Sequence, residues 1–163
     1  MIIRELKQSD FRDLQKNIFV RDTVPDVEER TKTNINRMAK GEIIVLVAEL
    51  NGEVVGNMQL TKYSHPLYAH RVKLDDVVVC HHFWGKGIAR KLFEACKERS
   101  KSENISIIET LVRGGEPAEQ VYKKLGFVEY GRQPDGIFEP WSGNAFDEVA
   151  LCVMVGEPKC PAQ

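Results

Sequence analysis

The chain has 163 residues, of which 42% are hydrophobic and 29% charged, and its formal net charge at pH 7 is −1. This size and composition are typical of one globular domain with a buried core. The near-neutral charge argues against a nucleic-acid partner, and no apolar run approaches the roughly 20 residues that span a bilayer. We expect a single domain over residues 1–156, a flexible C-terminal tail over residues 157–163 and no membrane partner.

The N-terminal residues and the cysteines favour a cytoplasmic protein. Residues 1–5 become charged at once and lack the apolar region of a signal peptide. The four cysteines are scattered without the CxxC pairs of a zinc site, at Cys80, Cys96, Cys152 and Cys160. We interpret them as reduced thiols and expect no metal.

The first half of the chain predicts helices followed by a β-hairpin. Ser9 and Asp10 are suitable N-cap residues, and Gly41 is a suitable C-cap. Asn51-Gly52 between two apolar runs is the strongest short-range signal of a hairpin. The expected order is a strand at 2–6, a helix at 9–18, a break at 22–26, a helix at 27–39 and strands at 43–50 and 54–62.

The second half predicts strands that alternate with helices. The continuous apolar run Val77-Val78-Val79 is typical of a strand that is covered on both faces. The expected order is a strand at 71–79, a helix at 86–101, a strand at 105–112, a helix at 117–125 and strands at 127–130 and 149–155. The helix at 86–101 has one apolar face, formed by Ile88, Leu92, Phe93 and Cys96. A strand-helix-strand crossover implies a parallel pair, so the fold class is α/β (α+β).

A glycine turn joins the strand at 71–79 to the following helix. Gly85 and Gly87 leave room for an anion to approach main-chain N–H groups, which have no partner at a helix start. Lys86 and Arg90 add positive charge. The spacing fits neither a Walker loop nor a dinucleotide fingerprint, because no Ser or Thr follows the lysine and Arg90 occupies the sixth position.

The segment Trp84-Gly85-Lys86-Gly87-Ile88-Ala89 resembles the phosphate motif [Gln/Arg]-x-x-Gly-x-[Gly/Ala] of the GNAT superfamily of N-acetyltransferases. Downstream, Val121-Tyr122-Lys123-Lys124-Leu125-Gly126-Phe127 is similar to the second signature of that family, Tyr-x-x-Leu-Gly-Phe. The order of elements agrees from residue 2 to about residue 155. Two departures are Trp84, in place of Gln or Arg, and Gly115, where many members carry Asn.

The resemblance implies a central mixed, strongly twisted sheet of about seven strands, flanked by about four helices. It implies that acetyl-CoA serves as the acyl donor, without a metal. The pyrophosphate would be held by the segment of the glycine turn, namely Trp84, Gly85, Lys86, Gly87, Ile88, Ala89 and Arg90. Backbone amides near Val77, Val78 and Val79 would bind the pantetheine and the thioester carbonyl.

The resemblance also implies direct transfer of the acetyl group to an amine. Tyr122 would be the acid that protonates the departing thiolate. Asp75 is a candidate base, Glu109 is its rival, and a water chain is a third alternative. The expected acceptor is a small-molecule amine, such as an amino acid, polyamine, amino sugar or antibiotic-like compound. The alternatives are a protein N-terminus or lysine, or a non-catalytic acyl-CoA sensor. A homodimer is compatible with the resemblance.

Overall fold

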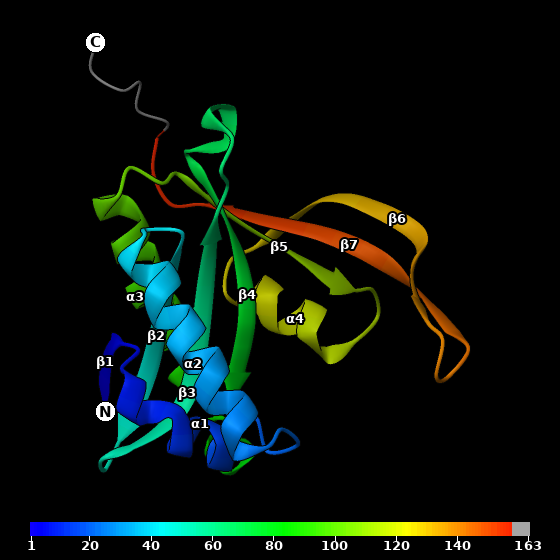
Figure 1. Cartoon of the computed structure of the whole chain (residues 1–163). Helices are drawn as coiled ribbons and strands as arrows, with labels where there is room; N and C mark the ends of the chain where they lie inside the picture. Colours follow the sequence, from blue (N-terminus) through cyan, green and yellow to red (C-terminus); the bar gives the residue numbers. More distant parts are fainter. Residues whose placement is uncertain (158–163) are drawn as a thin grey trace.

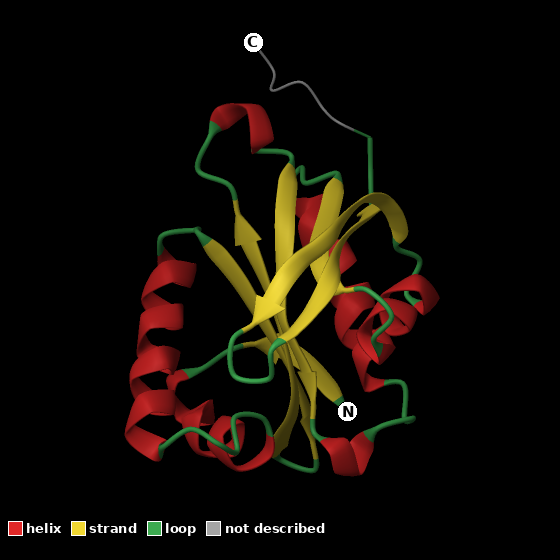
Figure 2. Ribbon diagram, turned by 90° about the vertical axis from the view of Figure 1, so that its right-hand side faces the viewer, coloured by secondary structure: helices red, strands yellow, loops and turns green. Residues whose placement is uncertain are grey.

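A computed structural model describes residues 1–157, which form one seven-stranded mixed sheet with helices on both faces (Figures 1 and 2). The strand order in the sheet is β1-β2-β3-β4-β5-β7-β6. The strands are β1 (Ile2–Glu5), β2 (Ile43–Leu50), β3 (Glu53–Lys62), β4 (Arg71–Val79), β5 (Ile107–Arg113), β6 (Val128–Glu139) and β7 (Asn144–Met154). The α-helices are α1 (Phe11–Asn17), α2 (Val24–Ala39), α3 (Ile88–Ser102) and α4 (Pro117–Lys124). The predicted mixed sheet of about seven strands with about four helices is confirmed, whereas residues 158–163 of the predicted tail lie outside the described residues.

The predicted hairpin between β2 and β3 is confirmed. Its two-residue turn places Asn51 at φ 53° and Gly52 at φ 84°, the left-handed conformations that such a turn requires. The predicted parallel pair is also confirmed, because β4 lies parallel to β5. It is the one parallel pair among the strands of the described sheet.

The start of α2 differs from the prediction. The helix begins at Val24 rather than Val27, and Pro25 lies in its first turn, where a backbone N–H is not required. Thr23 is the N-cap, and its side chain accepts a hydrogen bond from the N–H of Asp26. Asp10 occupies the predicted N-cap position of α1 but makes no side-chain capping bond, since its carboxylate accepts hydrogen bonds from Arg4 and from the N–H of Lys7.

The C-terminal hairpin is longer than predicted. The segment after Tyr130, which lies between the predicted strands at 127–130 and 149–155, continues as β6 and pairs with β7 as far as Glu139 opposite Asn144. Pro134 lies within an irregularity between Gln133 and Ile137, where the ladder needs no N–H from it. The two strands extend beyond the rest of the sheet as a curved arm (Figure 1).

Close packing of α3 against β3 supports the turn that precedes the helix. The predicted apolar face of α3 is confirmed, because Ile88, Leu92, Phe93 and Cys96 are all buried. Gly56 of β3 lies beneath the first turns of this helix, and a Cβ atom there would lie 3.0 Å from Leu92 Cδ1 and 3.2 Å from Ile88 Cγ2. The missing side chain at Gly56 therefore lets the start of α3 approach the sheet.

We expect Gly56→Val to destabilise the protein, because the added methyl groups overpack the contact with Ile88 and Leu92. A cost of about 1–3 kcal/mol is typical of overpacking, and each kcal/mol corresponds to about 2–4 °C in Tm for a domain of this size. The matched control is Gly131→Val, since the nearest atom to a Cβ there is Ala150 Cβ at 3.7 Å. Equal melting temperatures for the two variants would contradict the assigned packing.

Candidate functional site

Strands β4 and β5 pair only briefly and then separate. Their register covers Arg71 opposite Ile107, Val72 opposite Ile108 and Lys73 opposite Glu109. Within the described chain, residues 74–79 of β4 have no strand partner on that edge, while β5 remains paired with β7 on its other side. Unpaired backbone groups need partners of another kind. The gap between the two strands is therefore a place where a ligand can bind main-chain groups.

A bulge in β4 turns the end of the strand away from β5. The β3–β4 register shifts between Asn57 and Gln59, and Asp76 adopts a φ of 47°, which is uncommon for a residue other than glycine. The buried side chain of Asn57 donates a hydrogen bond to the carbonyl oxygen of Asp76 at 3.1 Å. Asn57 did not emerge from the sequence, where the only signal was a polar residue within an apolar strand.

Tyr122 lies near the point where β4 and β5 separate. We call this point the vertex of the gap. Thr110 of β5 connects the two strands there, because its hydroxyl donates a hydrogen bond to the carbonyl oxygen of Leu74 in β4 at 3.1 Å. Tyr122 is half-buried, and its ring packs edge-on against Phe127 with centroids 5.3 Å apart. Burial raises the pKa of Tyr122, the Thr110 hydroxyl lowers it, and the charge of Asp75 raises it, with a net increase. Its phenol is therefore protonated at neutral pH and available as a donor.

Asp75 lies beside the vertex on one face of β4. Its carboxylate accepts a hydrogen bond from the Thr61 hydroxyl at 3.0 Å and forms an ion pair with Lys73 at 3.1 Å. Side chains alternate along a strand, so Lys73 and Asp75 share a face, and Glu109 shares it because it is paired with Lys73. The structure thus brings both candidate bases to the same side of the gap.

Glu109 is more strongly held than Asp75. It is only 5% exposed, and its carboxylate accepts hydrogen bonds from Tyr63, Arg71 and Tyr130. Burial alone would raise the pKa of Glu109, but the hydrogen bonds from Tyr63 and Arg71 and the charge of Arg71 outweigh it, so the pKa is lowered. The carboxylate is thereby stabilised in its charged form.

The glycine turn presents free backbone donors. Gly85 and Gly87 have φ of 76° and 75°, and Gly87 is the N-cap of α3 without a side-chain capping bond. The first helical bond runs from the N–H of Lys91 to the oxygen of Gly87, at 3.1 Å. Among the described residues, the N–H groups of 85–90 have no hydrogen-bond acceptor. This arrangement can bind an anion such as a phosphate.

The side chains of the turn have different surroundings. Lys86 and Arg90 are exposed, and the Lys86 ammonium lies 4.8 Å from the ring centre of Phe83. Ile88 is buried in the core, so only its backbone can face a ligand, and Ala89 is half-buried. The indole N–H of Trp84 donates to the oxygen of Val79 at 2.7 Å, although the side chain is exposed. The last three residues of β4, Val77 to Val79, are half-buried and lie at the end of the strand that leads into this turn.

Glu119 fixes the start of α4 and was not anticipated from the sequence. Its carboxylate accepts a hydrogen bond from the N–H of Gly115 at 2.8 Å and forms ion pairs with Lys123 at 2.5 Å and Arg132 at 3.1 Å. The hydrogen bonds from Lys123 and Gly115 lower the pKa of Glu119 to about 2. Glu119 thus orients the helix that carries Tyr122.

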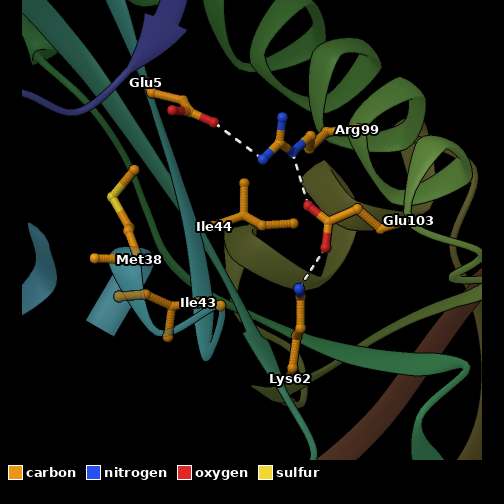
Figure 3. Close-up of a pocket in the computed structure, with 9 residues that line it drawn as sticks. Glu5, Met38, Ile43, Ile44, Lys62, Arg99 and Glu103 are labelled. Atoms are coloured by element: carbon orange, nitrogen blue, oxygen red, sulfur yellow. Dashed lines mark hydrogen bonds and ion pairs between the residues drawn. The ribbon is translucent and has the colours of Figure 1, made fainter. Parts of the chain in front are cut away.

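A separate surface pocket of about 210 Å³ contains none of the predicted site residues (Figure 3). It lies between the end of α2, the start of β2 and the second half of α3, over Met38, Ile43 and Ile44. Its charged side chains pair with one another, as Figure 3 shows for Glu5 with Arg99, Arg99 with Glu103 and Glu103 with Lys62.

The described residues contain neither a cluster of metal-binding side chains nor a membrane-spanning helix. Within residues 1–157, no group of three or more His, Cys, Asp or Glu side chains could hold a metal ion. Over the same part of the chain, no helix is both long enough and apolar enough to cross a membrane.

Solved structures of acetyltransferases share this fold. The structure of yncA from Salmonella typhimurium with its cofactor acetyl-CoA has a TM-score of 0.81 and 22% identity, over 99% of this chain and 97% of that one. A ribosomal-protein-alanine N-acetyltransferase from Brucella melitensis has a TM-score of 0.78 and 24% identity, over 94% and 99% of the two chains. A chimera of spermidine N-acetyltransferase SpeG from Vibrio cholerae and hSSAT has a TM-score of 0.74 and 20% identity, over 95% and 96%.

The sequence comparisons are consistent with these structures at the level of the family. No curated protein sequence matches the chain. The sequence model of the Acetyltransferase (GNAT) family matches residues 3–127, which is most of the chain. The protein therefore belongs to the GNAT family of acetyltransferases.

Proposed function

We propose that this protein transfers the acetyl group of acetyl-CoA directly to a primary amine of a small molecule. The observation that carries the proposal is the gap between β4 and β5, which has free amides of the glycine turn at one end and Tyr122 at its vertex. When bound, acetyl-CoA would supply an activated thioester, whose carbonyl carbon an amine can attack. The N–H groups of residues 85–90 fit the pyrophosphate, with Lys86 and Arg90 adding positive charge.

Two further parts of the site support the transfer. Backbone amides at the free edge of residues 77–79 are positioned to donate hydrogen bonds to the thioester oxygen, and removing one such donor costs about 3 kcal/mol in a well-studied enzyme. The protonated phenol of Tyr122 can donate to the departing sulfur. Both groups are fixed before a ligand arrives, because Thr110 and Glu119 hold the strand vertex and the helix.

Asp75 is the better candidate for the base. Glu109 is stabilised as an anion by three hydrogen-bond donors, and this weakens it as a proton acceptor. Asp75 has fewer partners and lies beside the bulge at the vertex. We therefore assign proton removal to Asp75, directly or through water, and a positioning role to Glu109.

Negative charge beside the gap favours a cationic acceptor. The carboxylate of Asp75 lies on the face of β4 that also carries Glu109. Burial raises the pKa of Asp76, and the nearby negative charge of Asp75 raises it further. Negative charge of this kind favours a cationic amine in the encounter. One neighbour in fold is named for spermidine and another for the alanine of a ribosomal protein. A protein N-terminus therefore stands as the alternative acceptor.

The decisive experiment is CoA release from acetyl-CoA across a panel of polyamines, amino acids, amino sugars and peptides with N-terminal alanine. We expect release above the rate of hydrolysis with at least one class of small amine. Release with peptides alone would favour the alternative acceptor. Binding of acetyl-CoA without release for any amine would favour a sensor.

We expect Tyr122→Phe to lower kcat about 100-fold, because general-acid catalysis contributes about 10²–10⁴-fold. The Kd for acetyl-CoA should not change, since the ring and its contact with Phe127 remain. Tyr68→Phe is the matched control, because the described residues provide no hydrogen bond to the Tyr68 hydroxyl. An unchanged kcat for Tyr122→Phe would remove the tyrosine from the mechanism.

We expect Asp75→Asn to lower kcat with little change in Tm, and Glu109→Gln mainly to lower stability. The cost of Glu109→Gln is about 1–3 kcal/mol at pH 7, because Arg71 loses its charged partner. The folded-state pKa of Glu109 is below its ordinary value of 4.5, so its stabilisation is present above that pH and is lost as the pH falls through the lowered pKa. Melting curves from pH 7 to pH 3 should therefore converge for wild type and Glu109→Gln. A constant difference would contradict the assignment.

A further inference from the structure

Trp84 occupies an unusual position in the glycine turn. Its side chain is 70% exposed, yet its indole N–H makes a 2.7 Å hydrogen bond to the carbonyl oxygen of Val79. An exposed indole at the surface contributes little to a core. The hydrogen bond instead connects the turn to the last residue of β4, five positions earlier in the chain.

The carbonyl of Val79 points into the gap between β4 and β5. The N–H of Cys80 donates to the oxygen of Val55 in β3 at 2.8 Å. Backbone groups of successive strand residues point to opposite edges, so those of Val79 point away from β3. On that edge β4 has no strand partner beyond Lys73. The indole of Trp84 therefore fills a hydrogen-bonding position that would otherwise be open in the gap.

The segment that follows Trp84 has few other hydrogen bonds before α3 begins to pack on the sheet. The N–H of Trp84 donates to His81 at 3.1 Å, and the next backbone donor with a partner among the described residues is Lys91. Between Trp84 and Lys91, Gly85 and Gly87 have positive φ. A Cβ atom added to either glycine would have no other atom within 4 Å, so packing does not hold these two residues in place. Within residues 1–157, the indole bond is thus the side-chain hydrogen bond that ties this turn to the sheet.

We infer that Trp84 is a positioning residue that holds the amides of the glycine turn in register with the free edge of β4. The inference rests on the proposed function, in which the turn binds the pyrophosphate of acetyl-CoA and the strand edge binds its pantetheine arm. The two halves of this ligand are covalently linked, so the two binding regions must keep a fixed separation. Trp84 thereby favours phosphate binding indirectly, because it positions the backbone amides and does not itself need to contact the phosphates.

The test compares acetyl-CoA binding by wild type, Trp84→Phe and Trp141→Phe. Phenylalanine keeps an aromatic ring and removes the N–H donor. A hydrogen bond of about 0.5–1.5 kcal/mol predicts a Kd that is about 2- to 13-fold higher for Trp84→Phe. We expect the Tm of the unliganded variant to stay within about 2 °C of wild type, because the site is exposed. Trp141, which is 78% exposed and has no hydrogen bond within the described residues, is the matched control.

A kinetic readout separates positioning from folding. With an acceptor found in the amine panel, Trp84→Phe should raise KM for acetyl-CoA by the same factor and leave kcat unchanged. Equal Kd values for wild type and Trp84→Phe would overturn the inference, and so would a loss of unliganded stability that accounts for the weaker binding. Failure of the wild type to bind acetyl-CoA would instead overturn the proposed function, and the inference with it.

A measurement on the wild-type protein does not depend on any variant. The two tryptophans give two indole N–H signals in a nitrogen-correlated NMR spectrum. The indole N–H of Trp84 should exchange with solvent more slowly than that of Trp141, because only the former is hydrogen-bonded. Exchange at equal rates would show that the bond does not persist in solution, which also overturns the inference.

Discussion

The short pairing between β4 and β5 determines the arrangement of the rest of the site. A sheet normally satisfies the main-chain groups of each interior strand on both edges. Here the pairing stops after Lys73 and Glu109, because the bulge at Asp76 directs the end of β4 away from its neighbour. The cost of leaving backbone groups unpaired is of the order of 1–3 kcal/mol for each buried group. The protein offsets part of that cost with side chains and leaves the remainder for a ligand.

The side chains that serve β4 are all donors to its carbonyl oxygens. Thr110 binds Leu74, Asn57 binds Asp76 and Trp84 binds Val79. None of them accepts a hydrogen bond from an N–H group of the strand. These three carbonyls are therefore satisfied within the protein, and the N–H groups on the free edge of the strand remain as donors toward the gap. A surface that offers hydrogen-bond donors suits a ligand that is rich in oxygen acceptors. An acyl thioester that carries a pyrophosphate is such a ligand.

Local rules predicted the parts of the structure that depend on neighbouring residues. The Asn51-Gly52 turn and the buried face of α3 follow from backbone conformation and helical spacing, and both were correct. Two other features depend on tertiary pairing. The irregularity around Pro134 lets β6 continue, and the bonds of Glu109 come from residues 21 to 46 positions away. The glycine turn was located from its motif, but the role of Trp84 required the position of Val79, which no local pattern contains.

The same short pairing divides the sheet mechanically. Strands β1 to β4 and strands β5 to β7 are joined through three register positions and the helix α3. Side chains add to this seam between β4 and β5, because Thr110 donates to Leu74 and Arg71 donates to Glu109. On the helical side, Phe93 of α3 packs against Phe127 beside α4, with ring centroids 5.1 Å apart. Because backbone pairing across this seam is short, the strands on its two sides form two blocks, and local opening in proteins follows cooperative blocks of this kind. The register within each block is therefore set by that block's own strand pairs, so a local opening of the seam would leave both registers intact.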